Sequence, residues 1–247
     1  MSEASSPYRI GTSGWTYDHW RGLFYPETLP RTRWFAHYTQ TFSTVEINAT
    51  FYRTFGESTY RKWREQAPPG FTYVLKAPKP ITHYKGLENV AADIRAFWDS
   101  AVMLGEKLGM ILLQLAPSTP YDPERLRAAL LAFPDPTRVA VEFRHERWLT
   151  GEIRDLLNVL GVSFCDADAP RAPLRGWLTG RNAYLRLHGR SRWYAHCYSD
   201  PELDEIAALA RRHVEQGAQC VYVFFNNDFE GYAPENARAL IQRLTLC

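Results

Sequence analysis

The chain has 247 residues, of which 45% are hydrophobic and 23% charged. This length suits a single (β/α)8 barrel, which typically takes roughly 250 residues. The net charge of +2 offers no general attraction for a polyanion, so a nucleic-acid partner would need a local basic patch. The first ten residues lack the basic and apolar regions of a secretory signal, and no apolar run approaches the length of a membrane span.

The cysteine pattern agrees with an expected cytoplasmic location. Four cysteines are widely scattered, without a CxxC pair or metal-ligand spacing, and we expect them to be reduced thiols. They are Cys165, Cys197, Cys220 and Cys247.

Eight short apolar runs bounded by turn residues predict eight strands. They cover residues 8–11, 44–48, 71–76, 110–115, 139–145, 162–166, 183–189 and 220–225.

Helical patterns follow most of these strands. Asp122 with Pro123, Thr150, and Ser199 with Pro201 are helix starts, because they combine a capping side chain with proline or a following apolar face. Residues 169–182 break the alternation, since they hold two prolines and two glycines without helical periodicity. We therefore expect one α/β domain over residues 1–247, a (β/α)8 TIM-type barrel. An irregular connection should replace the helix between strands 6 and 7, and residues 1–7 should form a disordered tail.

An open doubly wound sheet is the alternative fold. That fold normally carries a glycine-rich phosphate turn after its first strand, and Gly11-Thr12-Ser13-Gly14 matches such a turn poorly. The loop that follows, to Pro30, is long and aromatic. It predicts either a lid or pocket wall, or a loop that packs its own aromatic rings on the barrel rim.

Polar side chains gather where the predicted strands end. In a (β/α)8 barrel the active site lies at the carboxyl ends of the strands, so residues far apart in sequence should converge there. Glu142 and Arg144 are two apart and share a strand face, where they form either a structural ion pair or part of a site. The residues at these ends are Glu46, Asn48, Lys76, Gln114, Glu142, Arg144, Asp166, Arg186, His188, Asn226 and Asp228.

The same positions resemble a known family, the domain-of-unknown-function 72 (YecE-like) family. The resemblance implies a TIM-type barrel and implies no activity. It rests on IGTSGW at 10–15, VEINATFY at 45–52, LKAPKPITH at 75–83, LLQL at 112–115, VEFRHERW at 141–148, YLRLHG at 184–189 and VYVFFNND at 221–228.

The leading hypothesis is an enzyme acting on a small substrate with a phosphate, carboxylate or sugar-acid group. Lys76, Arg144 and Arg186 would bind the anion. Hydrolase, isomerase and lyase chemistry all remain open. The expected catalytic residues are Glu142, His188, Glu46 and Lys76, the last also as a Schiff-base nucleophile, and the expected substrate-binding residues are Arg144, Arg186, Asn48, Gln114, Asn226, Tyr52, Trp15 and His83.

Two alternatives remain open. A divalent metal on Glu46, Glu142, Asp166 and His188 would suit a phosphodiesterase or sugar isomerase, although nearby arginine and lysine disfavour a cation and no cofactor is predicted. A non-catalytic nucleic-acid-binding protein is less favoured. Its contacts would be basic residues interleaved with aromatic ones: Arg53, Lys79, Lys85, Arg190 and Arg192 with Tyr52, Tyr84, Trp193 and Tyr194.

Overall fold

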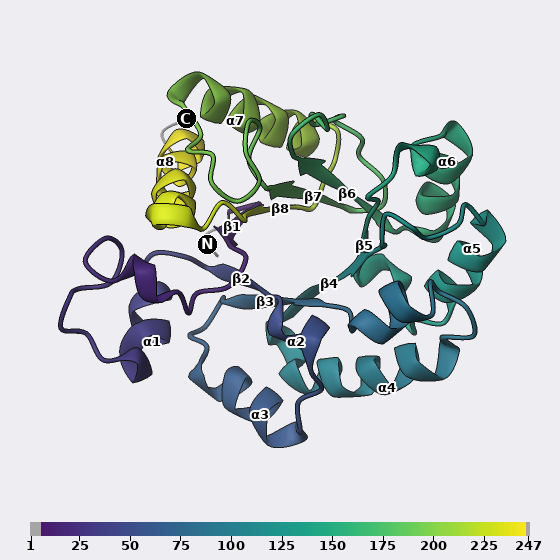
Figure 1. The fold of residues 1–247 in the computed structure, drawn as a ribbon, viewed down its shortest axis with the longest axis horizontal. Helices are drawn as coiled ribbons and strands as arrows, with labels where there is room; N and C mark the ends of the chain where they lie inside the picture. The colour runs from purple at the N-terminus through teal and green to yellow at the C-terminus, as the bar shows by residue number, and fades with distance from the viewer. Residues whose placement is uncertain (1–5, 246–247) are drawn as a thin grey trace, which may run out of the picture. The chain divides into compact units, whose positions relative to one another are not determined.

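A computed structural model of the chain describes residues 6–245. Eight β-strands and eight α-helices follow one another in this part of the chain, with short 3-10 or π turns between them (Figure 1). The strands are β1 Tyr8–Thr12, β2 Thr44–Ile47, β3 Thr72–Lys76, β4 Leu108–Gln114, β5 Val139–Glu142, β6 Ser163–Asp168, β7 Asn182–Leu187 and β8 Cys220–Phe225. The helices are α1 Trp34–Tyr38, α2 Ala49–Tyr52, α3 Glu57–Gln66, α4 Ala91–Ala101, α5 Pro123–Leu131, α6 Gly151–Leu160, α7 Asp200–Glu215 and α8 Tyr232–Thr245.

The strands form a sheet in the hydrogen-bonded order β1-β8-β7-β6-β5-β4-β3-β2. From β2 to β8, sequence neighbours are sheet neighbours, and β1 pairs with β8. The pairs β1–β8, β7–β8, β3–β4, β4–β5 and β5–β6 are parallel. Strands alternate with helices, so the predicted (β/α)8 TIM-type barrel fold is confirmed. Residues 169–181 connect β6 to β7 without a helix, as predicted.

The predicted N-terminal tail lies mainly outside the described residues, because the description begins at Ser6. The carbonyl of Pro7 already accepts a hydrogen bond of 2.8 Å from the backbone N–H of Val221.

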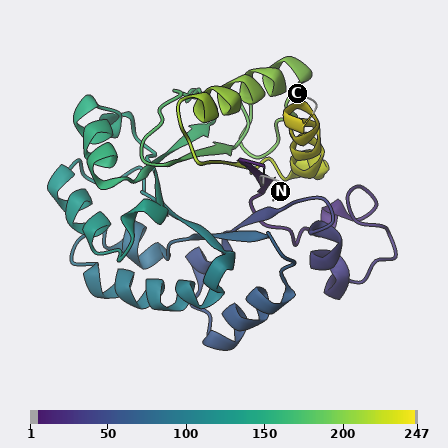
Figure 2. The ribbon, with the colours of Figure 1, turned by 180° about the vertical axis from the view of Figure 1, so that it is seen from behind.

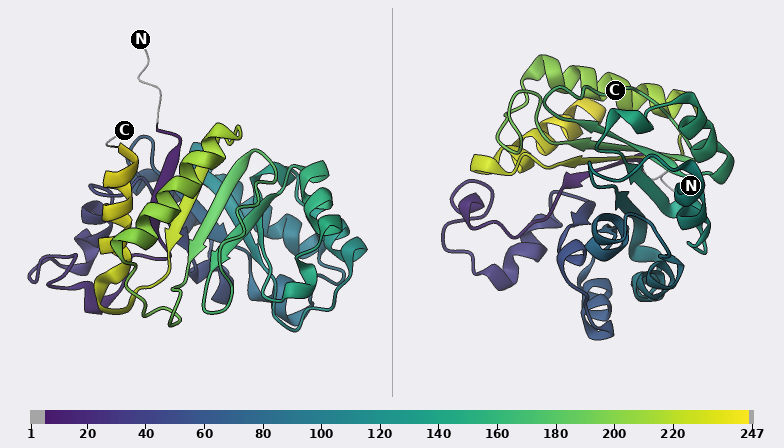
Figure 3. Two further views of the ribbon diagram at one scale, coloured as in Figure 1. Left: turned by 90° about the horizontal axis from the view of Figure 1, so that it is seen from above. Right: turned by 45° about the vertical axis from the view of Figure 1, so that its right-hand side comes forward.

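The described residues form two compact units. Unit 1 comprises residues 6–45 and 166–245, and unit 2 is Glu46–Cys165. In unit 1, α7 and α8 pack on each other, and both contact β8 (Figures 1 and 3). Helix α7 begins where the sequence predicts, at a capping box formed by Ser199 and Glu202.

In unit 2, strands β3, β4 and β5 pair in parallel, and α3, α4, α5 and α6 follow one another as packed neighbours (Figure 2). All four residues of β5 are buried, as expected for a strand covered on both faces. The predicted helix starts are confirmed, because Asp122 accepts from the backbone of Arg125 and Thr150 from that of Ile153.

The aromatic loop after β1 packs its own rings. Trp20, Tyr25 and Trp34 have 1% exposure or less, and the Tyr25 ring stacks on Trp34 at 4.4 Å between centroids. The loop thus packs its own rings, as one interpretation expects, and His19 of the same loop also lines a cavity, as the other expects. Trp15 remains partly exposed, with its ring 5.3 Å from that of Phe35.

No disulfide joins the described cysteines Cys165, Cys197 and Cys220, whereas Cys247 lies outside the described residues. Within residues 6–245, no helix combines the length and apolar character needed to cross a membrane.

Gly11 in β1 lies where the start of β2 comes too close for a side chain. A Cβ at this position would overlap the carbonyl oxygen of Thr44 and lie 3.0 Å from the Tyr38 hydroxyl. We therefore expect Gly11→Ala to destabilise the protein by about 1–3 kcal/mol, which lowers the melting temperature by several degrees.

Gly151→Ala is the matched control, because Gly151 opens helix α6 and a Cβ there meets no atom within 4 Å. Alanine at this position should be neutral or stabilise by up to about 1 kcal/mol. Equal melting temperatures for the two variants would contradict the inference that a side chain at position 11 collides with the Thr44 carbonyl.

Candidate functional site

The buried carboxylate of Glu142 is the centre of the polar group in unit 2. Its side chain has no exposed surface, and it forms an ion pair with Arg144. Gln114 Nε2 donates to Glu142 Oε1 at 3.0 Å, and Cys165 Sγ lies 3.9 Å from Glu142 Oε2. The predicted pair of Glu142 and Arg144 therefore exists, with an amide and a thiol as further partners.

Strand register explains why Gln114 reaches Glu142. The two residues are directly paired across β4 and β5, so their side chains leave the sheet on the same face. Arg144 follows two residues after Glu142 and its side chain is 18% exposed, which leaves the guanidinium partly accessible beside a fully buried acid.

Phe51 joins two predicted site residues of unit 2. The Lys76 ammonium lies 4.0 Å from the centroid of the Phe51 ring, a cation–π distance, and the His83 ring meets Phe51 edge-on at 4.9 Å. Thr50 positions this ring, because its hydroxyl donates to the Lys76 carbonyl at 2.7 Å. Tyr52 continues the same helix with 75% of its surface exposed. Sequence reasoning missed Phe51 and Thr50, although both lie inside the VEINATFY motif.

His83 lies among positive charges. It belongs to the single π turn Pro80–Tyr84, and its Nδ1 is 2.8 Å from the Thr82 hydroxyl oxygen. Partial burial lowers the pKa of His83 below its usual 6.5, and the charges of Lys76, Lys79 and Arg144 lower it further. We call Lys76, Lys79, Arg144 and His83 the cation cluster.

Glu46 and Asn48, the other predicted residues of unit 2, come from the end of β2. Glu46 is fully buried. Asn48 is partly exposed, and its backbone carbonyl accepts the first hydrogen bond of helix α2, from Phe51.

Unit 1 brings together Arg186, His188 and Asn226, all of which are 8% exposed or less. Arg186 Nη1 lies 3.3 Å from His188 Nε2, and the Asn226 side-chain amide lies 3.0 Å from His188 Nδ1. A guanidinium only donates, so Nε2 is the acceptor and the proton of a neutral imidazole is at Nδ1. The structure places Asn226 Nδ2 toward Nδ1, so a proton at Nδ1 requires the amide to be turned over to present its oxygen.

Two aspartates at the end of β6 have structural partners. Asp166 accepts backbone hydrogen bonds from Arg175 and Gly176 at 2.7–2.9 Å, which fastens the irregular segment before β7. Asp168 accepts from Arg190 Nε at 2.9 Å, and Arg190 also donates to Glu205 at 2.7 Å.

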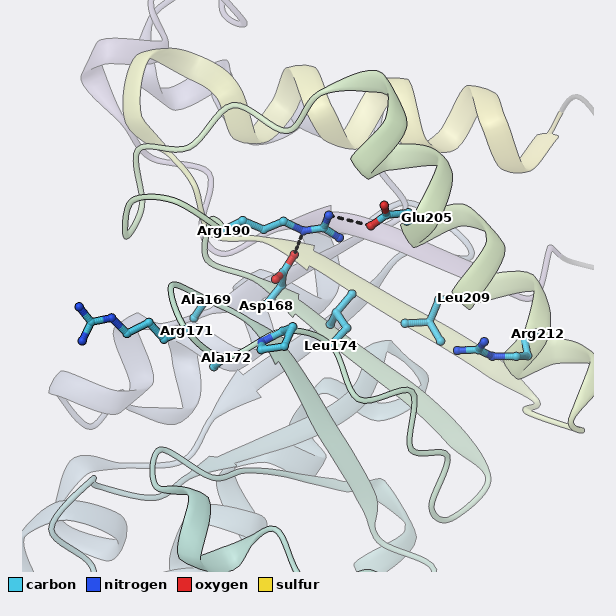
Figure 4. A pocket seen from close by; sticks show the side chains of 10 residues that line it. Asp168, Ala169, Arg171, Ala172, Leu174, Arg190, Glu205, Leu209 and Arg212 are labelled. Atoms are coloured by element: carbon cyan, nitrogen blue, oxygen red, sulfur yellow. Dashed lines mark hydrogen bonds and ion pairs between the residues drawn. The ribbon is translucent and has the colours of Figure 1, made fainter.

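Figure 4 shows this ion-pair network in a cavity of about 390 Å³ between the 169–174 segment and α7. Sequence reasoning missed the network, because Asp168, Arg190 and Glu205 come from three separate elements. Arg190 is therefore paired within the protein, while Arg171 and Arg212 also line the cavity.

The structure bears on both alternatives. Among residues 6–245, no three His, Cys, Asp or Glu side chains lie close enough together to hold a metal ion. Of the five basic residues considered for nucleic acid, Lys85 pairs with Asp93 at 2.6 Å and Arg190 with three carboxylates. These two cations are therefore partly neutralised within the protein.

Fold and clusters together define a (β/α)8 barrel protein with polar residues at its strand ends. The family model described as "Protein of unknown function DUF72" matches residues 9–246, and the chain belongs to this family. The expectation from the sequence motifs is thus confirmed.

Several relatives align with this chain over nearly its full length. The UPF0759 protein YunF of Bacillus subtilis is 26% identical, with 96% of this chain and 94% of that protein covered. A crystal structure of a DUF72 family protein from Thermotoga maritima matches with a TM-score of 0.87 and 29% identity, covering 97% of this chain and 99% of that one. Another, from Enterococcus faecalis, has a TM-score of 0.84 at 21% identity, covering 97% and 96%, and shares the fold.

The buried carboxyl of Asp166 predicts a pH dependence of stability. Burial raises its pKa to about 6, and the backbone donors from Arg175 and Gly176 only partly oppose this. Because the folded-state pKa exceeds the unfolded value near 3.8, the stabilisation is complete below about pH 4 and is lost as pH rises through about 6.

Asp166→Asn cannot ionise, so its stability relative to the natural protein should rise across this range, by up to roughly 3 kcal/mol. Chemical denaturation of both proteins from pH 4 to pH 7 measures this difference. A difference that stays constant would contradict a raised pKa at Asp166.

Proposed function

We propose that this protein is an enzyme that acts on a small substrate with a phosphate, carboxylate or sugar-acid group, and that the anion binds at the cation cluster. One observation carries the proposal: the Lys76 ammonium and the His83 ring both contact Phe51, and burial together with the charges of Lys76, Lys79 and Arg144 lowers the pKa of His83. Positive charges gathered in this way repel one another, and a bound anion relieves that repulsion. The folded chain holds them together at a cost that ligand binding would offset.

The two cations nearest the strand ends are positioned differently. Lys76 is 7% exposed and its ammonium rests on the Phe51 ring, which keeps a flexible side chain in one place. Arg144 is oriented by its ion pair with Glu142. Together they offer a point charge and a planar donor group, a combination that suits phosphate or carboxylate.

Glu142 and Glu46 are the proton-transfer groups proposed for unit 2. A substrate anion that attracts Arg144 would loosen its ion pair with Glu142 Oε1 and so make the carboxylate a better proton acceptor. Gln114 would remain hydrogen-bonded to the same oxygen at 3.0 Å and keep the carboxylate oriented. Asn48 and Tyr52 would contact substrate hydroxyl groups.

Unit 1 supports the same kind of chemistry by itself. His188 is a second proton-transfer group, and Arg186 is a second buried cation within 3.3 Å of it. Asn226 fixes the tautomer of the imidazole, and Trp15 would supply an apolar contact. The proposal requires no cofactor, and it includes hydrolysis, isomerisation and lyase chemistry.

Anion binding should raise the pKa of His83, because a negative charge favours the imidazolium. We expect sulfate, whose charge does not change near neutral pH, to raise the His83 pKa and to bind more tightly as pH falls. The measurement is an NMR titration of the histidine ring protons, with the His83 signal assigned by its loss in His83→Gln.

Lys79→Gln and Lys85→Gln are a matched pair for this titration. Loss of Lys79 should raise the His83 pKa without sulfate and reduce the response to sulfate. Loss of Lys85, which pairs with Asp93, should leave both nearly unchanged. If sulfate leaves the His83 pKa of the natural protein unchanged, the proposed anion site is overturned.

Catalysis is tested separately, with a panel of phosphorylated and carboxylated sugars and hydroxy acids. For any substrate that turns over, Glu142→Gln should reduce kcat by about 10²–10⁴-fold, since the amide keeps the shape but cannot take up a proton. Borohydride reduction in the presence of carbonyl substrates should leave a mass adduct on Lys76 if that residue forms a Schiff base. A sulfate response at His83 without turnover of any compound would indicate an anion-binding protein instead of an enzyme.

A further inference from the structure

A second cavity in unit 1, of about 470 Å³, is lined by aromatic side chains that the proposed function does not use. Three segments build it: His19 in the loop after β1, residues 192–195 after β7, and residues 228–230 after β8. Trp193, Tyr194 and Phe229 each leave 41–44% of their surface exposed. We call this cavity the aromatic pocket.

The aromatic side chains are exposed but held by the backbone. The N–H of Tyr194 donates to the His188 carbonyl at 2.8 Å, and the N–H of Phe229 donates to the Tyr194 carbonyl at 3.2 Å. The first bond closes the loop after β7 on itself, and the second ties it to the loop after β8. The rings therefore present a prepared surface, which costs little conformational entropy when a ligand binds.

Backbone strain accompanies this surface. Tyr194 has φ of 63° and Glu230 has φ of 49°, in the left-handed region that bulky side chains rarely adopt. Such residues typically cost about 1–3 kcal/mol each, and they gather at ligand sites. Both lie in the lining of the aromatic pocket.

The aromatic pocket adjoins the buried polar group of unit 1. The Trp193 ring lies 5.2 Å from that of His188, which in turn contacts Arg186 and Asn226. A ligand on the outer face of Trp193 would therefore be separated from the imidazole of His188 only by the Trp193 ring.

The charges in the lining indicate the class of ligand. Two carboxylates, Asp228 and Glu230, line the pocket together with Arg192 and His19, so the pocket has no excess of positive charge for a polyanion. His19 Nε2 lies 3.7 Å from an Asp228 carboxylate oxygen. Carboxylate, guanidinium and imidazole groups together suit a ligand with many hydroxyl groups, which both donate and accept hydrogen bonds. Aromatic faces carry partial negative charge and pack well on the C–H face of a sugar ring.

We propose that the aromatic pocket binds the pyranose ring of a neutral carbohydrate, which stacks on Trp193 while Asp228 and Arg192 bind its hydroxyl groups. This site lies within unit 1 and stands independently of anion binding at the cation cluster. It would make the protein a sugar-binding protein even if the anion proposal fails.

The test is ligand-observed NMR by saturation transfer from the full chain to a set of neutral hexoses and disaccharides, with affinities from tryptophan fluorescence. We expect saturation of ring protons on one sugar face and binding insensitive to salt. Trp193→Ala should weaken binding about tenfold or more, and Trp193→Phe should retain part of it. Asp228→Asn should also weaken binding, because a hydroxyl acceptor loses its charge.

Tyr84→Ala is the matched control, since Tyr84 is a 72% exposed aromatic residue of unit 2 and should not affect sugar binding. Preferential binding of nucleosides over every sugar would overturn the proposal in favour of base stacking. Absence of saturation transfer to any sugar would also overturn it. In Trp193→Ala the sulfate response of His83 should persist, so the two proposals succeed or fail separately.

Discussion

The burial of the Glu142 carboxylate is the constraint on which unit 2 depends. An ionised carboxylate without exposed surface is costly unless charge and hydrogen bonds compensate it, and here Arg144 and Gln114 do so. Both partners are available because β4 and β5 are parallel and in register at Gln114 and Glu142. The geometry of the candidate site thus follows from the pairing of two strands, and a shift by one residue would turn these side chains to the other face.

Unit 2 also gathers positive charge, because Lys76, Lys79 and Arg144 all act on His83. Lys76 makes a cation–π contact with Phe51, and Arg144 forms an ion pair with Glu142. His83 is held in the π turn that begins at Pro80. Unit 1 also holds a candidate proton-transfer group with neighbouring polar side chains. Arg186 and Asn226 contact the two ring nitrogens of His188. By contrast, the aspartates at the end of β6 are used for structure: Asp166 fastens the irregular segment, and Asp168 orders Arg190. Similar residue types at equivalent strand ends therefore serve two different purposes.

Local signals were sufficient for most of the fold. Asp122, Thr150 and Ser199 cap helices as predicted, because a short polar side chain before an apolar face satisfies backbone donors within a few residues. The absence of a helix between β6 and β7 was also visible in the prolines and glycines of that segment. The π turn at Pro80–Tyr84 and the position of Phe51 were not visible, since both depend on packing between segments that are distant in sequence.

By itself, the sequence determined the alternation of strands with helices, the caps, and the set of polar residues at the strand ends, because each of these depends on neighbours within about one helical turn or one strand. Tertiary structure decided which of those residues meet. It joined Glu142 to Gln114 and Arg144, and it paired Asp168 with Arg190 and Glu205. It also tied the loops after β7 and β8 into the aromatic pocket. These contacts depend on strand register and on left-handed backbone at single residues such as Tyr194, which no local pattern of side chains specifies.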